Sequence, residues 1–233
     1  MNKLLLNCLL FIAPCFVYAQ QNEATIALLR KLDSLQASSS DSRYFASLYF
    51  NITVKALDFF SKKEKPVQDF MQRLELRFAG YFFEAADAHN SKNEIPPVWK
   101  TYYTDSNLSR LQYFLLGANA HINGDIWQAM TTEFSLQELK EFKKEYYRFN
   151  KKLKEELFFV YDTAFNTVTK VRLLHSFTFG FDRSYAKLML VRWRKRQMKL
   201  SELWFTDKEK FAVKLSALKK KMAAFDKLVL QNL

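Results

Sequence analysis

The sequence is poor in the residues that form tight turns and in those that form disulfides. Its 233 residues include only four glycines, four prolines and two cysteines. Sandwiches, barrels and doubly wound sheets need glycine and proline in their many turns, so the composition argues against these architectures. Two cysteines also exclude a disulfide scaffold. Hydrophobic residues make up 49% of the chain, which is too apolar for a disordered protein and predicts a packed core.

The N-terminal segment has the pattern of a secretory signal peptide. Lys3 precedes an apolar run that ends at Val17, and Val17 and Ala19 occupy the positions that a signal peptidase reads. We therefore expect a signal peptide over residues 1–19 and a helical domain over residues 20–233. The apolar run is shorter than the roughly 20 residues of a membrane anchor. The signal predicts export to the periplasm or secretion.

Removal of this segment changes the composition of the mature protein. Both cysteines, Cys8 and Cys15, lie within it, so the mature chain has no thiol nucleophile and no disulfide. Loss of Lys3 leaves 35 basic and 24 acidic residues, and the formal charge falls from +12 to +11. The apolar core alone must therefore stabilise the mature domain.

Apolar residues recur at spacings of three and four through almost all of the mature chain. This period is typical of amphipathic helices, and no segment shows sustained strand alternation. The sequence thus predicts a single-domain, all-α bundle of about seven helices. The predicted helices cover residues 24–35, 43–60, 67–88, 108–130, 135–165, 183–204 and 206–230, with a short helix near 99–103.

Capping signals mark several of the predicted helix ends. Pro66 suits the first turn of the third helix. Ser135 with Glu138, and Thr206 with Glu209, have the spacing of a capping box, in which a hydroxyl and a carboxylate each accept a backbone N–H. Interruptions are expected at residues 166–172 and 180–182.

The most apolar predicted helix, residues 108–130, contains an unusual cluster of polar side chains: Asn119, His121, Asn123 and Asp125. Burying such groups without partners costs roughly 1–3 kcal/mol each. In one interpretation they form a network that fixes helix register, with the asparagines bonding a neighbouring helix. In a variant, Asn123 and Gly124 end one helix and Asp125 caps the next. Gly117 would allow a backbone or a ligand to approach closely.

A metal site is the sharper interpretation of the same cluster. His121 and Asp125 are four residues apart, so an imidazole and a carboxylate share one helix face and supply half of a zinc or iron coordination sphere. His175 is the expected further ligand, and His89 is a weaker candidate. From spacing alone, a structural role is favoured over a metal site, because such pairs are common by chance.

The segment from Gly117 to Asp125 resembles the signature of a family of uncharacterised bacterial helical proteins, Gly-x-Asn-Ala-His-Ile-Asn-x-Asp. The likeness extends to Phe78-Ala79-Gly80-Tyr81-Phe82 and Pro97-Val98-Trp99, and more weakly to Trp193. The resemblance implies an all-helical domain in which Asn119, His121, Asn123 and Asp125 are the distinctive polar residues. It implies no established activity.

A weaker likeness is to the zinc-dependent phospholipase C and single-strand nuclease group, whose helices carry His-x-x-Gly-Asp-x-x-Gln-Pro-x-His. The chain matches at His121, Gly124, Asp125 and Gln128, and departs at Ala129 and Thr131. That resemblance implies a trinuclear zinc cluster with several histidines. This chain has three histidines in all, so at most one or two ions could be held.

Basic residues concentrate near the C-terminus, where aromatic residues are interleaved with them. The simplest interpretation is a solvated basic helical face. In the alternative, the cations bind an anionic lipid or a polysaccharide, because export makes these partners more plausible than nucleic acid. A small molecule of unknown identity is a further expected ligand. The basic residues are Arg192, Arg194, Lys195, Arg196, Lys199, Lys208, Lys210, Lys214 and Lys219 to Lys221, and the aromatic ones are Trp193, Trp204 and Phe205.

These patterns lead to two main hypotheses of function. The first is a metal-assisted hydrolase of a phosphoester or related ester, in which His121 and Asp125 bind a divalent metal such as zinc and Asn119 or Asn123 orients the substrate. The second is a non-catalytic binding or structural module whose polar cluster is a buried hydrogen-bond network. A surface-binding protein that uses the basic terminal helices is a third class.

Overall fold

The structure, a computed structural model, describes residues 23–104, 107–167 and 181–232. The expected signal peptide, residues 1–19, lies outside the described residues, as does His175. Within the described ranges the protein is an all-α single domain without strands, which confirms the predicted fold class. No described helix is both long and apolar enough to cross a bilayer.

The helices follow the predicted periodic segments closely. The expected short helix near residue 99 is a 3₁₀ turn followed by one α-helical turn. The elements are α2 (Glu23–Ala37), α3 (Ser42–Ser61), α4 (Lys65–Asn90), η1 (Pro97–Trp99), α5 (Lys100–Thr104), α6 (Arg110–Ala118), η2 (Asn119–Asp125), α7 (Ile126–Glu133), α8 (Leu136–Thr167), α10 (Phe181–Thr206) and α11 (Lys208–Asn232).

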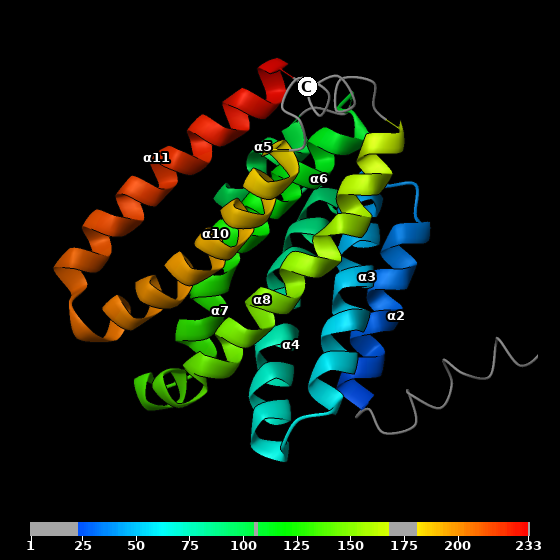
Figure 1. Ribbon diagram of the computed structural model, residues 1–233. Coiled ribbons are helices and arrows are strands. Elements are labelled where there is room, and N and C mark those ends of the chain that lie inside the picture. The colour runs from blue at the N-terminus through cyan, green and yellow to red at the C-terminus, as the bar shows by residue number, and fades with distance from the viewer. Residues whose placement is uncertain (1–22, 105–106, 168–180, 233) are drawn as a thin grey trace, which may run out of the picture.

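The segment η2 lies at the centre of the bundle. It contacts α4, η1, α10 and α11 as well as its own continuations α6 and α7. On one side, α2 packs on α3; on the other, α10 lies against α8 and α11 runs back beside α10 along the edge of the molecule (Figure 1). Residues of η2 therefore face the core helices in one direction and the α10–α11 pair in the other.

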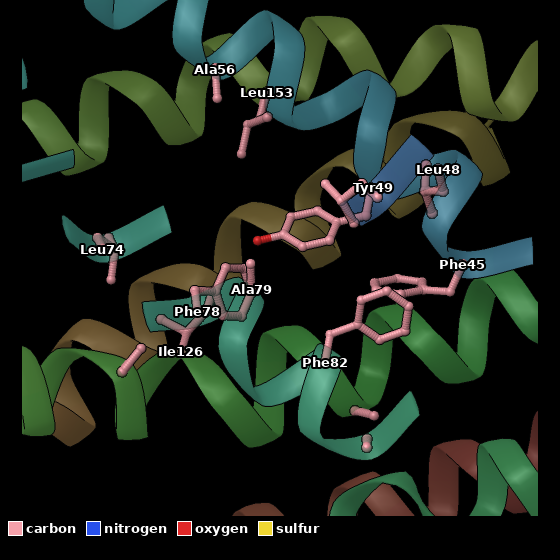
Figure 2. Packing of buried hydrophobic residues seen from close by; sticks show 14 of the residues in the cluster. Phe45, Leu48, Tyr49, Ala56, Leu74, Phe78, Ala79, Phe82, Ile126 and Leu153 are labelled. Carbon is pink, nitrogen blue, oxygen red and sulfur yellow. The ribbon is translucent and has the colours of Figure 1, made fainter. Parts of the chain in front are cut away.

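The main core is aromatic and surrounds η2 from the side of α3 and α4. Phe45, Tyr49, Phe78 and Phe82 are all buried and lie close together (Figure 2). Their ring centroids are 5.1–6.3 Å apart, mostly in edge-to-face geometry, which is the favourable arrangement for aromatic pairs. Trp99 from η1 completes this group. A smaller apolar cluster, Leu200, Phe211, Leu218 and Met222, joins α10 to α11.

The central helix differs from the expected continuous α-helix. Residues Asn119–Asp125 form a π-helix between α6 and α7. Asp125 has helical backbone angles, and its side chain makes no capping bond, so the variant in which Asp125 caps a new helix is wrong. Side-chain hydrogen bonds between residues four apart link successive turns of this segment. π-Helical turns are rare and concentrate at functional sites.

Of the two predicted capping boxes, one is confirmed and the other is wrong. The Ser135–Glu138 box is confirmed, with the Ser135 amide donating to the Glu138 carboxylate at 2.9 Å. The Thr206–Glu209 box is wrong, because Asp207 caps α11 instead by accepting the Lys210 amide at 2.9 Å.

Two further helix starts differ from the sequence analysis. Ser109 and Gln112 form a capping box on α6 that was not predicted, although Ser-x-x-Gln is a sequence signature of such a box. The expected interruption at residues 180–182 is wrong for Phe181 and Asp182, which are part of α10.

Alanine substitutions at Gly117 and Gly80 test how closely neighbouring residues approach these two helix positions. A Cβ on Gly117 would lie 2.7 Å from Cγ of buried Phe45, whereas a Cβ on Gly80 meets nothing within 4 Å. We expect Gly117→Ala to lower the free energy of unfolding by about 1–3 kcal/mol, as overpacking does. Gly80→Ala should raise it by up to about 1 kcal/mol, since alanine favours the helix. Urea unfolding measures both; equal effects would contradict the close approach.

Candidate functional site

The four polar residues of η2 point to two opposite sides. Residues two apart lie about half a turn apart on a helix, and residues four apart share a side. His121 and Asp125 accordingly face the aromatic core, whereas Asn119 and Asn123 face α10 and α11. All four side chains are at most 2% exposed. The cluster predicted from the sequence is therefore two adjacent groups rather than one.

On the core side, one carboxylate oxygen joins η1 to η2. Oδ2 of Asp125 lies 3.0 Å from Nδ1 of His121 and accepts a 3.0 Å hydrogen bond from Nε1 of Trp99. Trp99 is fully buried, so its indole N–H needs this partner. Trp99 follows Pro97 and Val98 in the chain. The side chain of Val98 lies against Gly124, one residue before Asp125.

Aromatic rings enclose the imidazole of His121. The Phe78 ring stacks on it with centroids 3.4 Å apart and an interplanar angle of 10°, and the Tyr49 ring lies edge-on at 4.6 Å. Phe45 and Trp99 are within 6 Å. The other ring nitrogen, Nε2, has no hydrogen-bond partner among the described residues. This environment favours a neutral imidazole.

Burial opposes charge on both members of the pair. It lowers the pKa of His121 well below 6.5, and the nearby Arg194 cation lowers that pKa further. Burial also raises the pKa of Asp125 well above 3.8, although the Trp99 hydrogen bond acts in the opposite direction. Both shifts favour a pair without net charge, in which the imidazole is neutral and the carboxyl is protonated.

On the other side of η2, the two asparagines bind the C-terminal helices. Asn119 donates from Nδ2 to the Met222 carbonyl at 3.1 Å and to Asp226 at 2.7 Å, both on α11. Asn123 donates to Oδ1 of Asn119 at 2.9 Å and accepts from Gln197 of α10 at 3.2 Å. A chain of side-chain hydrogen bonds thus runs from α10 through η2 to α11.

A second buried polar group lies nearby, around Glu75 of α4. Glu75 is buried and accepts a 3.5 Å hydrogen bond from the Tyr49 hydroxyl. Burial raises the pKa of Glu75, an effect that the Arg194 cation partly offsets. Arg194 donates to buried Asn150. The sequence placed Arg194 on a solvated basic face, and this is wrong because only 4% of it is exposed.

The arrangement provides few ligands for a metal ion. Within the described ranges, no three His, Cys, Asp or Glu side chains gather where they could hold one. His121 and Asp125 bond each other and supply at most two donors, and the third expected ligand, His175, lies outside the described residues. His89 stacks instead on Tyr103, with centroids 4.4 Å apart, at the end of α4.

The asparagine side of η2 borders a cleft of about 250 Å³ between α10 and α11. We call it the η2 cleft. Its lining combines amides and cations with an apolar wall, and it contains no acidic residue. The polar lining residues are Asn119, Asn123, Arg192, Arg196 and Lys221, and the apolar ones are Met189, Trp193, Leu218, Met222 and Phe225. Burial lowers the pKa of the Arg196 guanidinium, so this cation is partly withdrawn from water.

Fold and site together define a helical single-domain protein built around a buried π-helical segment with histidine, asparagine and aspartate side chains. The chain belongs to a family of unknown function, DUF5995, whose model matches residues 22–232. The match covers all helices described above. Comparisons with curated proteins and with solved structures found no match.

The buried pair makes stability depend on pH in a way that can be predicted. Between pH 3.8 and 6.5, the folded pair and the unfolded pair each carry one proton: on Asp125 when folded, on His121 when unfolded. Above pH 6.5 the unfolded pair loses its proton, so the pair's contribution to stability falls with rising pH for as long as the folded pair keeps its own proton. Below pH 3.8 the unfolded pair gains a second proton, and the contribution falls as the pH drops.

The test compares the free energy of unfolding of wild type with that of the double variant His121→Gln/Asp125→Asn. We expect the difference to be largest near pH 4–6 and to fall by up to about 1.4 kcal/mol per pH unit above pH 6.5. Urea unfolding across this range measures it. The control His89→Gln, which removes a histidine outside the pair, should keep the wild-type profile. A difference that does not change with pH would show that the pair does not hold its proton on folding.

Proposed function

We propose that the protein is a binding module, and that the η2 cleft takes up a small anionic molecule with an apolar part. The observation that carries the proposal is the composition of the cleft. Three cations, Arg192, Arg196 and Lys221, line it together with five apolar side chains and the two asparagines of η2. Sites for small molecules commonly combine an apolar wall with a few polar groups that orient the ligand.

Charge complementarity favours an anion. A hydrogen bond to a charged group contributes about 1.5–3 kcal/mol, and the contribution increases where water is partly excluded, as it is around Arg196. Asp226 of α11 accepts a hydrogen bond from Asn119 and does not line the cleft. The charge facing a ligand is therefore positive.

The amide of Asn123 is suited to orient the ligand. Among the described residues, its Nδ2 donates to Oδ1 of Asn119 alone, which leaves one hydrogen for a ligand oxygen. The side chain lines the cleft and is fixed from both sides, by Asn119 and by Gln197. A donor held in this way binds at little entropic cost.

Metal-assisted hydrolysis of a phosphoester remains the alternative proposal, with His121 and Asp125 as ligands. It has weaker support, because the two side chains bond to each other and no third ligand gathers beside them among the described residues. Metal analysis of protein purified without an affinity tag separates the two proposals. Stoichiometric zinc, manganese or iron that is lost in His121→Ala would support hydrolysis, and its absence is the result expected for a binding module.

The fluorescent anion anilinonaphthalene sulfonate is a suitable first probe, since it carries a sulfonate on aromatic rings. We expect it to bind the wild type and to change the fluorescence of Trp193, which lines the cleft. The double variant Arg192→Gln/Arg196→Gln should raise its Kd about tenfold or more, which corresponds to the loss of at least one charge-assisted hydrogen bond.

The matched control is Lys140→Gln/Lys151→Gln, which removes the same charge from exposed positions of α8. It should change the Kd less than twofold, apart from screening by salt. Equal losses in both double variants would indicate general electrostatic attraction, and that result would contradict the η2 cleft as the binding site.

A further inference from the structure

A second hollow adjoins the η2 cleft along the same seam between α10 and α11. This hollow has a volume of about 340 Å³ and shares Arg196, Leu218 and Lys221 with the cleft. Figure 1 shows the two helices running side by side over most of their length. We call the combined feature the α10–α11 groove. Its first part is next to η2, and its second part lies toward the turn that joins the two helices.

The second part of the groove has an apolar floor. Leu200 and Leu218 are buried to 3% and 2% exposure, and Leu203 is partly buried at the far end. The rim is formed by Lys199 and Lys214. Lysine side chains on such a rim cover an apolar ligand with their methylene stems and keep the ammonium groups in water.

The groove follows α10 for about three helical turns. From Arg192 to Leu203 it follows eleven residues of α10, which corresponds to about 16 Å of helix. This is the extended length of a chain of roughly twelve carbons. A compact ligand would fill only the η2 cleft and leave the second part of the groove empty.

We infer that the α10–α11 groove binds an unbranched, single-chain amphiphile with an anionic headgroup. The inference rests on the proposed function and specifies its ligand class. The headgroup lies in the η2 cleft near Arg192, Arg196 and Asn123. The alkyl chain extends over Leu218 and Leu200 and ends near Leu203.

A single chain in the groove fits the structure better than a lipid bilayer beneath it. The apolar residues of the floor are recessed, with Leu200 and Leu218 almost fully buried. A chain can reach them by entering between the helices, whereas a flat membrane surface contacts only exposed residues. Cations line both parts of the groove, but the amides of Asn119 and Asn123 occur only in the η2 cleft, which matches a ligand whose polar end lies there.

The test is a series of linear alkanoates from acetate to tetradecanoate, each titrated below its micelle concentration by displacement of anilinonaphthalene sulfonate. Each added methylene should lower the Kd about two- to fourfold, up to roughly twelve carbons, and further carbons should change it little. Decanol, which has the chain without the charge, should bind at least tenfold more weakly than decanoate. This series needs only the wild-type protein.

Leu203 and Leu215 provide a matched pair of variants. Both are partly buried and pack on the same small cluster between α10 and α11, but only Leu203 lines the groove. Leu203→Asn should weaken dodecanoate at least fivefold and leave hexanoate unchanged. Leu215→Asn should affect neither ligand. Helical circular dichroism and thermal unfolding verify that both variants fold.

The outcomes separate this inference from the proposed function. A Kd that is independent of chain length but sensitive to Arg192→Gln/Arg196→Gln would overturn the chain-binding groove and retain the anion site. No binding of any alkanoate or of the dye would overturn both. Binding to phosphatidylglycerol vesicles without binding of monomeric alkanoates would also overturn the inference, because it would assign the cations to a membrane surface.

Discussion

The centre of the fold depends on one carboxylate oxygen, Oδ2 of Asp125. Within 3.0 Å it has both the indole N–H of Trp99 and the imidazole of His121, so it joins η1 to η2. Phe78 stacks on the imidazole and brings α4 to the same point. Loss of that oxygen leaves two buried polar groups without a partner, at a cost of roughly 1–3 kcal/mol each. The core around η2 is therefore held by polar contacts as well as by aromatic packing.

The same seven residues also determine the position of the C-terminal helices. Asn119 and Asn123 lie on the opposite side of η2 from His121 and Asp125, and they bond α11 and α10. One short π-helical segment thus connects an aromatic core with the walls of a groove. Its polar residues alternate between the two sides because residues two apart lie about half a turn apart.

The predictable features were those encoded locally. Helical periodicity and the Ser135–Glu138 box depend on neighbours within a few residues, and both were correct. The polar residues of η2 could be found because they interrupt an apolar helix. Partners distant in sequence, such as Trp99 for Asp125, could not be derived from spacing. Arg194 was misplaced because α10 is covered by both α8 and α11, so a basic residue there can be buried. No local sequence pattern predicted the π-helix.

The arrangement also accounts for how a positive groove can lie next to a segment that contains an aspartate. Burial keeps the carboxyl of Asp125 protonated and the imidazole of His121 neutral, so the pair adds no net charge behind the η2 cleft. Asp226 of α11 is bonded to Asn119 and lines neither part of the groove. The field in the groove is then set by the cations of α10 and α11, and a ligand anion meets no opposing charge from η2.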